Sequence, residues 1–428
     1  METKEKMSKE VVFYNELEDI EKKFLRKCKG FKEYILNNLI LYLKKEIVFR
    51  EKLIEEKENL SEKEEREDFS VKEYISYSNY LDLEELIDET EEIVDVIPYS
   101  MLVSLVSSFD YFLLSILEKI SNNKEGVARF QNTKINYEEI ESCSSLKGVK
   151  EYYTKKYLDE LFRKSHDEIF EEIKNKFNVA DIKDFSEYKK LLFIAEIRNI
   201  IVHNDGCKSV QFKNTLAKYG LKEIKTSIKF DKKGKVELDA KSILKILELI
   251  QIVSLKLFYK FVKHYFPNED KVKEKCESFL NNISLRRYKE NHPEIGLEIF
   301  GLLLSTATNS DDKFMYIINK AMCIKSIGKE DYKYLIESTN WIGASNRFLI
   351  AKSLLLDDFT TALEYIKNED KREAEFIFRE WPLCHRLVKT DEFKHYYFET
   401  YGIEYESYRK VWTATDKEYN ERRKNKKV

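Results

Sequence analysis

The chain has 428 residues, with 75 lysines and arginines, 78 aspartates and glutamates, and a formal net charge of -3. This length predicts two or three domains, because one domain usually holds roughly 100–200 residues. Hydrophobic residues make up 43% of the chain and charged residues 36%, a balance that excludes a disordered protein. The near-neutral charge excludes a basic surface over the whole molecule and confines any nucleic-acid contact to a local patch.

Turn-forming residues are scarce, with only 4 prolines and 11 glycines. Because β folds need many turns, this scarcity predicts an all-α protein. The six cysteines are scattered, with no Cys-x-x-Cys and no close Cys/His pair, so we expect neither a structural zinc site nor a disulfide scaffold, and no metal or cofactor. Residues 1–10 are polar and lack the apolar core of a secretory signal, so we expect a cytoplasmic protein.

Residues 1–80 are expected to form a long amphipathic helix over 11–58, followed by a charged linker. The apolar residues that recur on one helical stripe are Phe13, Leu17, Ile20, Phe24, Phe31 and Ile35. Such a helix packs on the rest of the protein or pairs with a second copy, and the sequence leaves both alternatives open. Residues 51–100 are strongly acidic and should face away from nucleic acid.

A second helical block is predicted over 81–122, with a break near Pro98. Between residues 97 and 117 the only charged residue is Asp110, and this segment is nearly long enough to span a bilayer. Its serines, tyrosines and Asp110 would be costly in lipid, so we expect a buried core helix with Pro98 in its first turn and no stable membrane insertion. A membrane-associated toxin that acts through this segment is the alternative.

Residues 123–150 have the composition of a loop, and helices are predicted over 151–178 and 184–202. Asp184 followed by Glu187 has the spacing of a capping box, which predicts the start of the second helix. Farther on, two alternating runs in residues 227–239 flank a short loop with a glycine, which predicts a β-hairpin. A strongly helical segment then covers 242–266.

A domain boundary is expected at Phe266–Asp270, where proline, asparagine and acidic residues interrupt the helical pattern. Residues 267–415 have the pattern of successive short helices, with small residues such as Ala321 and Ala351 at their crossings. This pattern predicts an α-solenoid or tetratricopeptide-like domain, a fold that commonly binds protein partners. Residues 416–428 form a basic tail.

The segment from Lys189 to Gly206, KKLLFIAEIRNIIVHNDG, has the strongest functional signal in the chain. It is apolar on nearly every helical face between residues 191 and 202, so we expect a buried helix. Helical spacing directs Arg198 and Asn199 along an apolar seam, with His203 at its mouth. Burial of an unpaired guanidinium is very unfavourable, so the sequence predicts that a negative group meets Arg198.

That negative group can belong to the protein or to a ligand. Glu196 can partner Arg198 in part, Asp110 is a second internal candidate, and His203 can bond the last free carbonyls of its helix. Residues 204–206, Asn-Asp-Gly, predict the end of this helix, with Gly206 as a left-handed C-cap.

RNIIVHN, Arg198–Asn204, resembles the motif of HEPN domains, in which four to six residues, usually beginning with Asn, Asp or His, separate an arginine from a histidine. The resemblance covers residues 81–266, where the apolar segment before Leu117 is similar to the first helix of that family. It implies a HEPN-like helical bundle with one small β-hairpin insertion, followed by the solenoid-like domain.

The resemblance also implies a function: metal-independent endoribonuclease activity, in which two chains pair and their Arg/His sets form one composite site. His203 would then be the general acid or base and Arg198 would stabilise charge on the phosphate, with support from Asn199, Asn204, Glu196 and Asp110. The expected partners are RNA, a second copy of the chain, and a protein partner or trigger held by the C-terminal helices. Such proteins often act as toxins or effectors in bacterial antiviral defence by abortive infection.

Two further points bear on this expectation. Some HEPN toxins have a tyrosine shortly after the histidine, which a partner nucleotidyltransferase modifies; Asn204 and Asp205 stand there in this chain, which puts that pairing in doubt.

The alternative function is a non-catalytic HEPN and helical-repeat scaffold that binds protein or RNA. In a scaffold, Arg198 would pair with Glu196 or Asp110 inside one chain, and His203 would be inaccessible.

Overall fold

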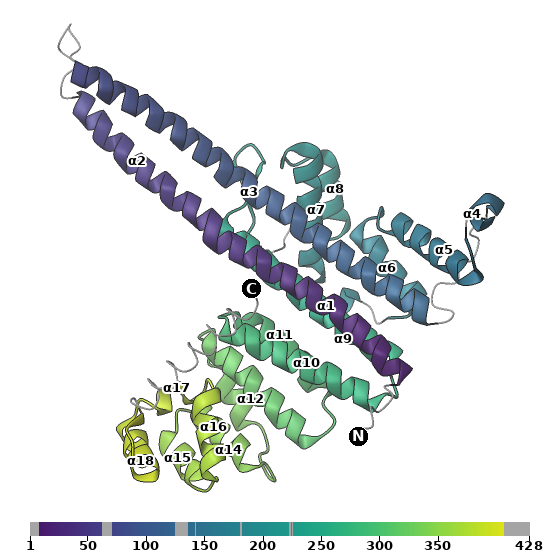
Figure 1. Ribbon diagram of the computed structural model, residues 1–428, viewed down its shortest axis with the longest axis vertical. Helices are drawn as coiled ribbons and strands as arrows, with labels where there is room; N and C mark the ends of the chain where they lie inside the picture. Colours follow the sequence, from purple (N-terminus) through teal and green to yellow (C-terminus); the bar gives the residue numbers. More distant parts are fainter. Residues whose placement is uncertain are drawn as a thin grey trace. The chain divides into compact units, whose positions relative to one another are not determined.

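The protein is mostly α-helical with one two-stranded sheet, so the predicted all-α class is confirmed (Figure 1). The computed structural model describes residues 8–61, 71–124, 136–141, 143–179, 182–221, 224 and 226–405. The central part of the predicted charged linker, residues 62–70, and the predicted basic tail, residues 416–428, lie outside the described residues.

The chain divides into two compact units, Met1–Ser278 and Phe279–Val428. The sequence predicts a boundary at residue 267, whereas the division falls after Ser278, inside a helix that covers Asp270–Lys289.

The elements of the first unit are, in chain order, α1 (Lys9–Tyr34), the π-helix η1 (Ile35–Leu39), α2 (Ile40–Ser61), α3 (Val71–Asn123), α4 (Tyr137–Glu141), α5 (Leu146–Leu161), α6 (His166–Phe177), the 3-10 helix η2 (Ile182–Asp184), α7 (Tyr188–Asn204), α8 (Val210–Lys218), β1 (Lys229–Phe230), β2 (Val236–Glu237) and α9 (Ala240–Tyr265).

The N-terminal helix is continuous, as predicted over 11–58, because α1, η1 and α2 follow one another without a break. The Ser8 side chain caps it by accepting a hydrogen bond from the amide of Val11. Phe13, Leu17 and Phe24, which belong to the predicted stripe, are buried. Beyond the bundle, α2 and the first half of α3 run side by side as a long helical hairpin (Figure 1).

The bundle forms around α3, which contacts α1, α2, α5, α7 and α9. Phe112 on α3 stacks on Phe24 of α1, with 5.0 Å between ring centroids. The predicted break near Pro98 is wrong, because α3 continues through this residue. An internal proline removes one helical hydrogen bond and costs about 3 kcal/mol. The buried apolar stripe that follows on one side of the helix, from Met101 to Ile120, offsets that cost through apolar burial.

One stretch of α3, Val96–Asn123, is long and apolar enough to cross a membrane, and half of its most apolar window is buried inside the protein. A core helix of a soluble protein has the same length and composition.

The predicted start of α7 is also wrong. Asp184 lies in η2, and α7 begins at Tyr188 with no side-chain hydrogen bond at its N-cap. The reason is tertiary: the Glu187 carboxylate instead accepts hydrogen bonds from Lys256 Nζ of α9, at 2.8 and 3.0 Å, in a buried ion pair. A capping box does form at α6, between Ser165 and Glu168.

The segment 123–150 is more helical than predicted, since it contains α4 and the start of α5; residues 125–135 and 142 lie outside the described part of the chain. The predicted hairpin is confirmed. Lys229 pairs with Glu237 and Phe230 with Val236 in an antiparallel register.

The elements of the second unit are α10 (Asp270–Lys289), which begins in the first unit, α11 (Pro293–Thr306), α12 (Ser310–Ser326), α13 (Asp331–Glu337), α14 (Asn346–Leu355), α15 (Phe359–Lys367), α16 (Lys371–Glu380), α17 (Cys384–Leu387) and α18 (Asp391–Tyr401).

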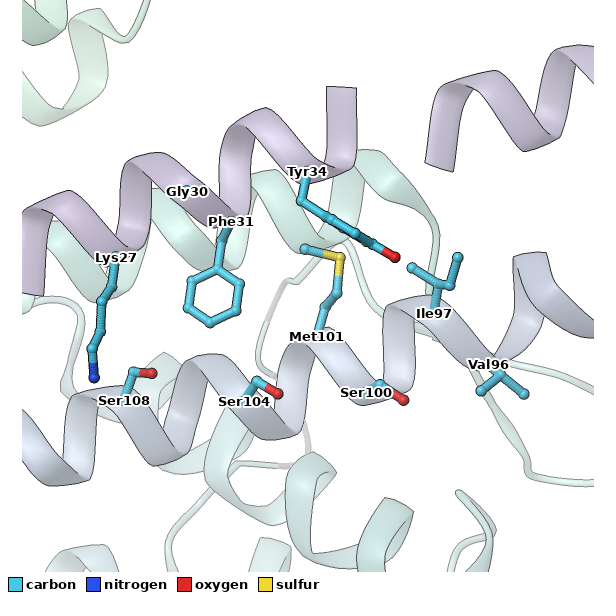
Figure 2. Close-up of a pocket in the computed structure, with 10 residues that line it drawn as sticks. All are labelled: Lys27, Gly30, Phe31, Tyr34, Val96, Ile97, Ser100, Met101, Ser104 and Ser108. Carbon is cyan, nitrogen blue, oxygen red and sulfur yellow. The ribbon is translucent and has the colours of Figure 1, made fainter. Parts of the chain in front are cut away.

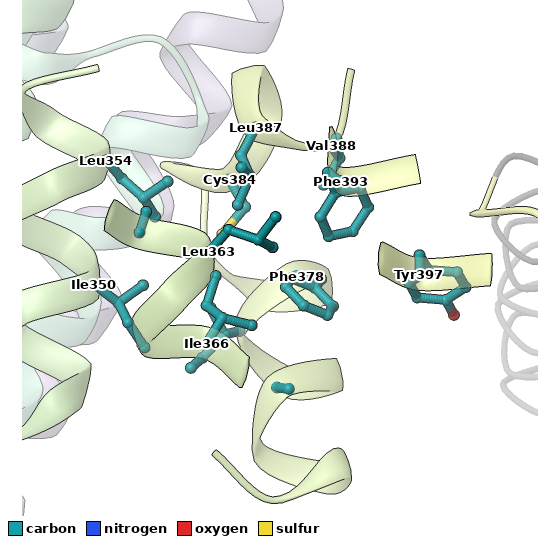
Figure 3. Close-up of a cluster of buried hydrophobic side chains, with 13 residues drawn as sticks. Ile350, Leu354, Leu363, Ile366, Phe378, Cys384, Leu387, Val388, Phe393 and Tyr397 are labelled. Carbon is teal, nitrogen blue, oxygen red and sulfur yellow. The ribbon is translucent and has the colours of Figure 1, made fainter. Parts of the chain in front are cut away.

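Helices that follow one another in this unit pack together, as α11 does with α12 and α14 with α15. Two apolar clusters form its core. Ala321 and Ala351 are buried in the first cluster, which joins α12, α13 and α14. Phe378 and Phe393 meet edge to face in the second, which gathers side chains from α14 to α18 (Figure 3).

A carboxyl group lies deep in the core of the first unit. Glu21 of α1 is fully buried, and Ser254 Oγ of α9 donates a hydrogen bond to its Oε1 at 2.9 Å. Its Oε2 has no partner among the described residues. Burial raises the pKa of Glu21 to about 8, and the Ser254 hydrogen bond opposes this rise. At neutral pH the folded protein therefore holds a proton on this carboxyl.

This buried carboxyl predicts a pH-dependent stability. The folded pKa of Glu21 lies above its ordinary value of 4.5, so folding retains a proton that the unfolded chain releases between pH 4.5 and about 8. The contribution of the protonated Glu21 to the free energy of unfolding is fully present below pH 4.5 and is lost as the pH rises through about 8. The slope is at most about 1.4 kcal/mol per pH unit. Glu21→Gln should remove this slope when urea unfolding is measured from pH 5 to 9.

The exposed Glu33 of the same helix provides the control, and Glu33→Gln should keep the wild-type slope. An unchanged slope in Glu21→Gln would contradict the prediction.

Candidate functional site

The candidate site is built on α7, which lies among α3, α6, α8 and α9. Its buried residues are Tyr188, Leu191, Leu192, Phe193, Ile194, Ala195, Ile197 and Ile200. Glu196, Arg198 and Asn199 are half-buried, so the surrounding helices restrict their side chains. The predicted burial over 191–202 is therefore confirmed as far as Ile200, whereas Val202 is exposed.

Arg198 has no carboxylate partner among the described residues. Its Nη1 donates to Asn199 Oδ1 at 3.2 Å, and Asn199 Nδ2 donates to Glu196 Oε1 at 3.4 Å. The Nε of Arg198 is buried without a hydrogen-bond partner in the described part of the chain. A neutral amide therefore stands between the guanidinium and the nearest carboxylate of its own helix. A half-buried cation without a counter-ion is a ready site for an anion.

Asp110 is occupied elsewhere. Its Oδ1 lies 2.8 Å from Nε2 of His166, the first residue of α6. Burial raises the pKa of Glu196, while the nearby His166 and the Asn199 hydrogen bond oppose this rise. Asp110, His166, Glu196, Asn199 and Arg198 thus form a polar series that crosses α3, α6 and α7.

Sequence reasoning missed His166, because its surroundings along the chain are charged and its partner Asp110 is 56 residues away. The sequence predicted a single helix over 151–178, whereas α5 ends at Leu161 and Ser165 caps a new helix, α6, that begins at His166.

His203 lies at the exposed end of α7. The helix ends at Asn204, as predicted, because Asp205 and Gly206 both adopt left-handed backbone angles, with φ of 46° and 75°. The amides of both residues donate to the carbonyl of Ile200. Among the described residues no hydrogen bond ties the His203 ring to these last carbonyls. Its imidazole is therefore open to solvent.

Asn204 has a structural role, since its Nδ2 donates to the carbonyl of Cys207 at 2.6 Å and holds the turn after the helix.

The β-hairpin is docked against this end of α7. Tyr99 of α3 donates its hydroxyl hydrogen to the carbonyl of Val236 at 2.5 Å. Lys235 forms an ion pair with Asp205 at 3.1 Å. Gly206 is buried beneath the hairpin, where an added Cβ would lie 3.0 Å from the Tyr99 hydroxyl and 3.2 Å from Val236 Cγ1. The hairpin thus fixes the backbone that directly follows His203.

The hairpin also brings basic side chains to this end of α7. Lys208 lies over the Phe230 ring, with its Nζ 3.8 Å from the centroid, and its amide donates to Gly234 in the hairpin loop. Lys232 and Lys233 are exposed in the same loop. The sequence predicted the hairpin but no anion-binding role for its lysines; the run Asp-Lys-Lys-Gly-Lys is the signal that could have indicated this role.

Together these groups can bind an anion and move a proton. The guanidinium of Arg198 and the hairpin lysines provide positive charge, and the imidazole of His203 can exchange a proton with solvent or a bound molecule. Within the described ranges, no group of three or more His, Cys, Asp or Glu side chains could hold a metal ion.

No family model matches this chain, and no match was found among curated proteins or solved structures. Any function proposed for the protein therefore rests on its own residues.

We predict that Gly206→Ala loosens the hairpin at the end of α7. The substitution adds left-handed strain of roughly 1–2 kcal/mol and a clash with Tyr99 and Val236 of similar size. Gly220→Ala is the matched control, because Gly220 is also left-handed but an added Cβ would meet only the tip of Lys189 at 3.7 Å. Hydrogen exchange of residues 229–237 should accelerate in Gly206→Ala alone. Equal effects of the two variants would contradict the docking described above.

Proposed function

We propose that this protein is a metal-independent endoribonuclease whose site contains Arg198 and His203. One observation carries the proposal: the half-buried guanidinium of Arg198 has no carboxylate partner among the described residues, and the exposed His203 follows it on the same helix. Both groups are suited to a phosphodiester. A guanidinium matches the geometry of phosphate oxygens, and imidazole transfers protons near neutral pH.

In this reaction His203 moves a proton to or from the 2′-hydroxyl or the leaving 5′-oxygen. Arg198 stabilises the negative charge that develops on the phosphate. Asn199 orients Arg198 through the 3.2 Å hydrogen bond to Nη1, and Glu196 in turn accepts from Asn199. Asp110 supports the site more remotely, through His166.

Each chain contributes one Arg/His set, and the proposed active form is a homodimer in which two sets face one RNA strand. The lysines of the hairpin would contact the phosphate backbone on either side of the cleaved bond. Such contacts position a nucleic acid without selecting a sequence.

The wider proposal is a HEPN-like bundle joined to a solenoid-like helical unit, acting in the cytoplasm as a toxin or effector of antiviral defence. The packing of successive helices in the second unit supports a repeat-like arrangement. This unit would hold a protein partner or sense a trigger.

The scaffold alternative has less support. It requires an ion pair between Arg198 and Glu196 or Asp110, together with an inaccessible His203. In the described residues Asp110 pairs with His166, Glu196 accepts from Asn199, and His203 is exposed.

The test is cleavage of single-stranded RNA by the purified full chain in the presence of EDTA. Arg198→Ala and His203→Ala should each lower the rate by about 100-fold or more, the usual contribution of such groups. A DNA strand of the same sequence should stay intact, because it lacks the attacking 2′-hydroxyl. Cleaved RNA should end in a cyclic phosphate.

His395→Ala is the control. This exposed histidine lies on α18 of the second unit, where it pairs with Glu399 of the same helix. It should leave the rate unchanged. If the double variant Arg198→Ala/His203→Ala cuts RNA as fast as the wild type, the proposed function is wrong.

A further inference from the structure

The first unit exposes a long apolar face. This face is formed by side chains of α1 and α3. Its apolar members are Phe31, Tyr34, Leu86, Ile93, Val96 and Tyr111. Tyr34, Leu86, Ile93, Val96 and Tyr111 are exposed, with Val96 at 60% and Tyr111 at 61%. On α3, Leu86, Ile93, Val96 and Tyr111 share one stripe with Ser100 and Ser104, because these residues are separated by three, four or seven positions. We call this surface the open face. Several large apolar side chains exposed along one helix face often mark an interface.

The open face is hollowed between α1 and α3. The groove has a volume of about 690 Å³ and is lined by Phe31 and Tyr34 on one side and Ile97 and Met101 on the other (Figure 2). Ser100, Ser104 and Ser108 also line the groove, and their small side chains leave space on its α3 side. A second hollow of about 310 Å³ continues the groove along the same seam, and the two share Lys27 and Ser108.

Charges of opposite sign lie at the two ends of the open face. At the bundle end, Lys23, Arg26 and Lys27 are exposed on α1. At the other end, Asp82, Glu85 and Glu89 are exposed on α3, and residues 82–95 contain no basic residue. A partner that covers the face must therefore present acidic groups at one end and basic groups at the other. The open face itself has that pattern when it is turned by 180°.

We propose that a second copy of this chain covers the open face, with the two α3 helices antiparallel about a two-fold axis near residues 98–99. With a rise of about 1.5 Å per residue, positions equally far from this axis face each other. Ser104 then lies opposite the partner's Ile93, and Tyr111 opposite the partner's Leu86. Ile93 thus meets a serine and Leu86 an aromatic ring, while Val96 lies opposite the partner's Met101.

The same register pairs the charges. Ser108 lies opposite the partner's Glu89, and Lys27 is held at this end, because its Nζ lies 5.1 Å from the centroid of the Tyr111 ring. Lys27 therefore meets the partner's Glu89, and Lys23 meets the partner's Asp82. A parallel arrangement would place Lys27 against the partner's Lys27. The two-fold arrangement is self-complementary, as an isologous interface must be.

Two other occupants fit the open face less well. An anionic membrane surface would repel the acidic end of α3. A nucleic acid would meet the same repulsion. The inference rests on the proposed function only for the existence of a homodimer, and its test does not involve RNA.

The test is the mass of the full chain by sedimentation equilibrium, with three variants. Each of Lys27→Glu and Glu89→Lys changes two symmetric contacts from attraction to repulsion. Each should weaken dimerisation by about tenfold or more at low salt. The double variant Lys27→Glu/Glu89→Lys restores both contacts in the opposite sense and should return the dissociation constant to near the wild-type value. This recovery distinguishes a direct contact from general destabilisation.

Thiol cross-linking tests the register. Ser100 is exposed beside the axis, so Ser100→Cys should form a disulfide-linked dimer when Cu(II)-phenanthroline is added as oxidant. Ser115→Cys, on the same helix and bordering the same groove, is the matched control. Its two copies would lie about 50 Å apart and should not join.

A monomeric wild-type chain, with or without bound anionic lipid vesicles, would overturn the proposal. So would a dimer that is indifferent to both charge reversals, or one that is cross-linked equally by both cysteines. A monomeric chain would contradict both this interface and the homodimeric form of the proposed nuclease, whereas RNA cleavage that depends on Arg198 and His203 can persist with a dimer of another register. A dimer with the proposed register can likewise exist without cleavage. The proposed register and the proposed cleavage therefore fail separately.

Discussion

The helix α3 is apolar over more of its circumference than its own bundle covers. The packing of the first unit and its exposed apolar surface both depend on this property. One side of the helix buries Phe109 and Phe112 against α1 and brings α7 and α9 into the core. That packing is strong enough to carry the helix through Pro98. The uncovered side carries Val96 and Tyr111, and apolar surface in water favours association. The same helix thus organises the bundle and carries the surface on which we propose that a second copy binds.

The pairing of the buried and half-buried polar groups determines which charges of the bundle are left to bind a ligand. The carboxylates of the candidate site have other partners, since Asp110 bonds His166 and Glu196 accepts a hydrogen bond from Asn199. Among the described residues, the only hydrogen-bond partner of Arg198's guanidinium is the neutral amide of Asn199. A protein that needed this guanidinium solely for stability would be expected to neutralise it within the chain, because an uncompensated half-buried cation is costly. Its unpaired state is easier to understand if its counter-ion is a phosphate.

Periodicity and helix-end signals were enough to predict most of the fold. The long N-terminal helix, the buried helix that ends after Asn204, and the hairpin all depend on residues close together in the chain, and these predictions were confirmed. The errors arose where a distant partner outweighed a local signal. Glu187 forms an ion pair with Lys256 instead of capping a helix that starts at Asp184, and the packing of α3 overrides the break expected at Pro98.

By itself, the sequence determined the helical class, the position of the Arg198–His203 motif on an apolar helix and the end of that helix, because these depend on short-range spacing. Only the tertiary structure decided which charges are paired. It brought His166 to Asp110, left Arg198 without a carboxylate among the described residues, and set the hairpin lysines beside the exposed end of α7. Ion pairing is a matter of distance in space, and residues far apart along the chain become neighbours only when apolar burial has folded it.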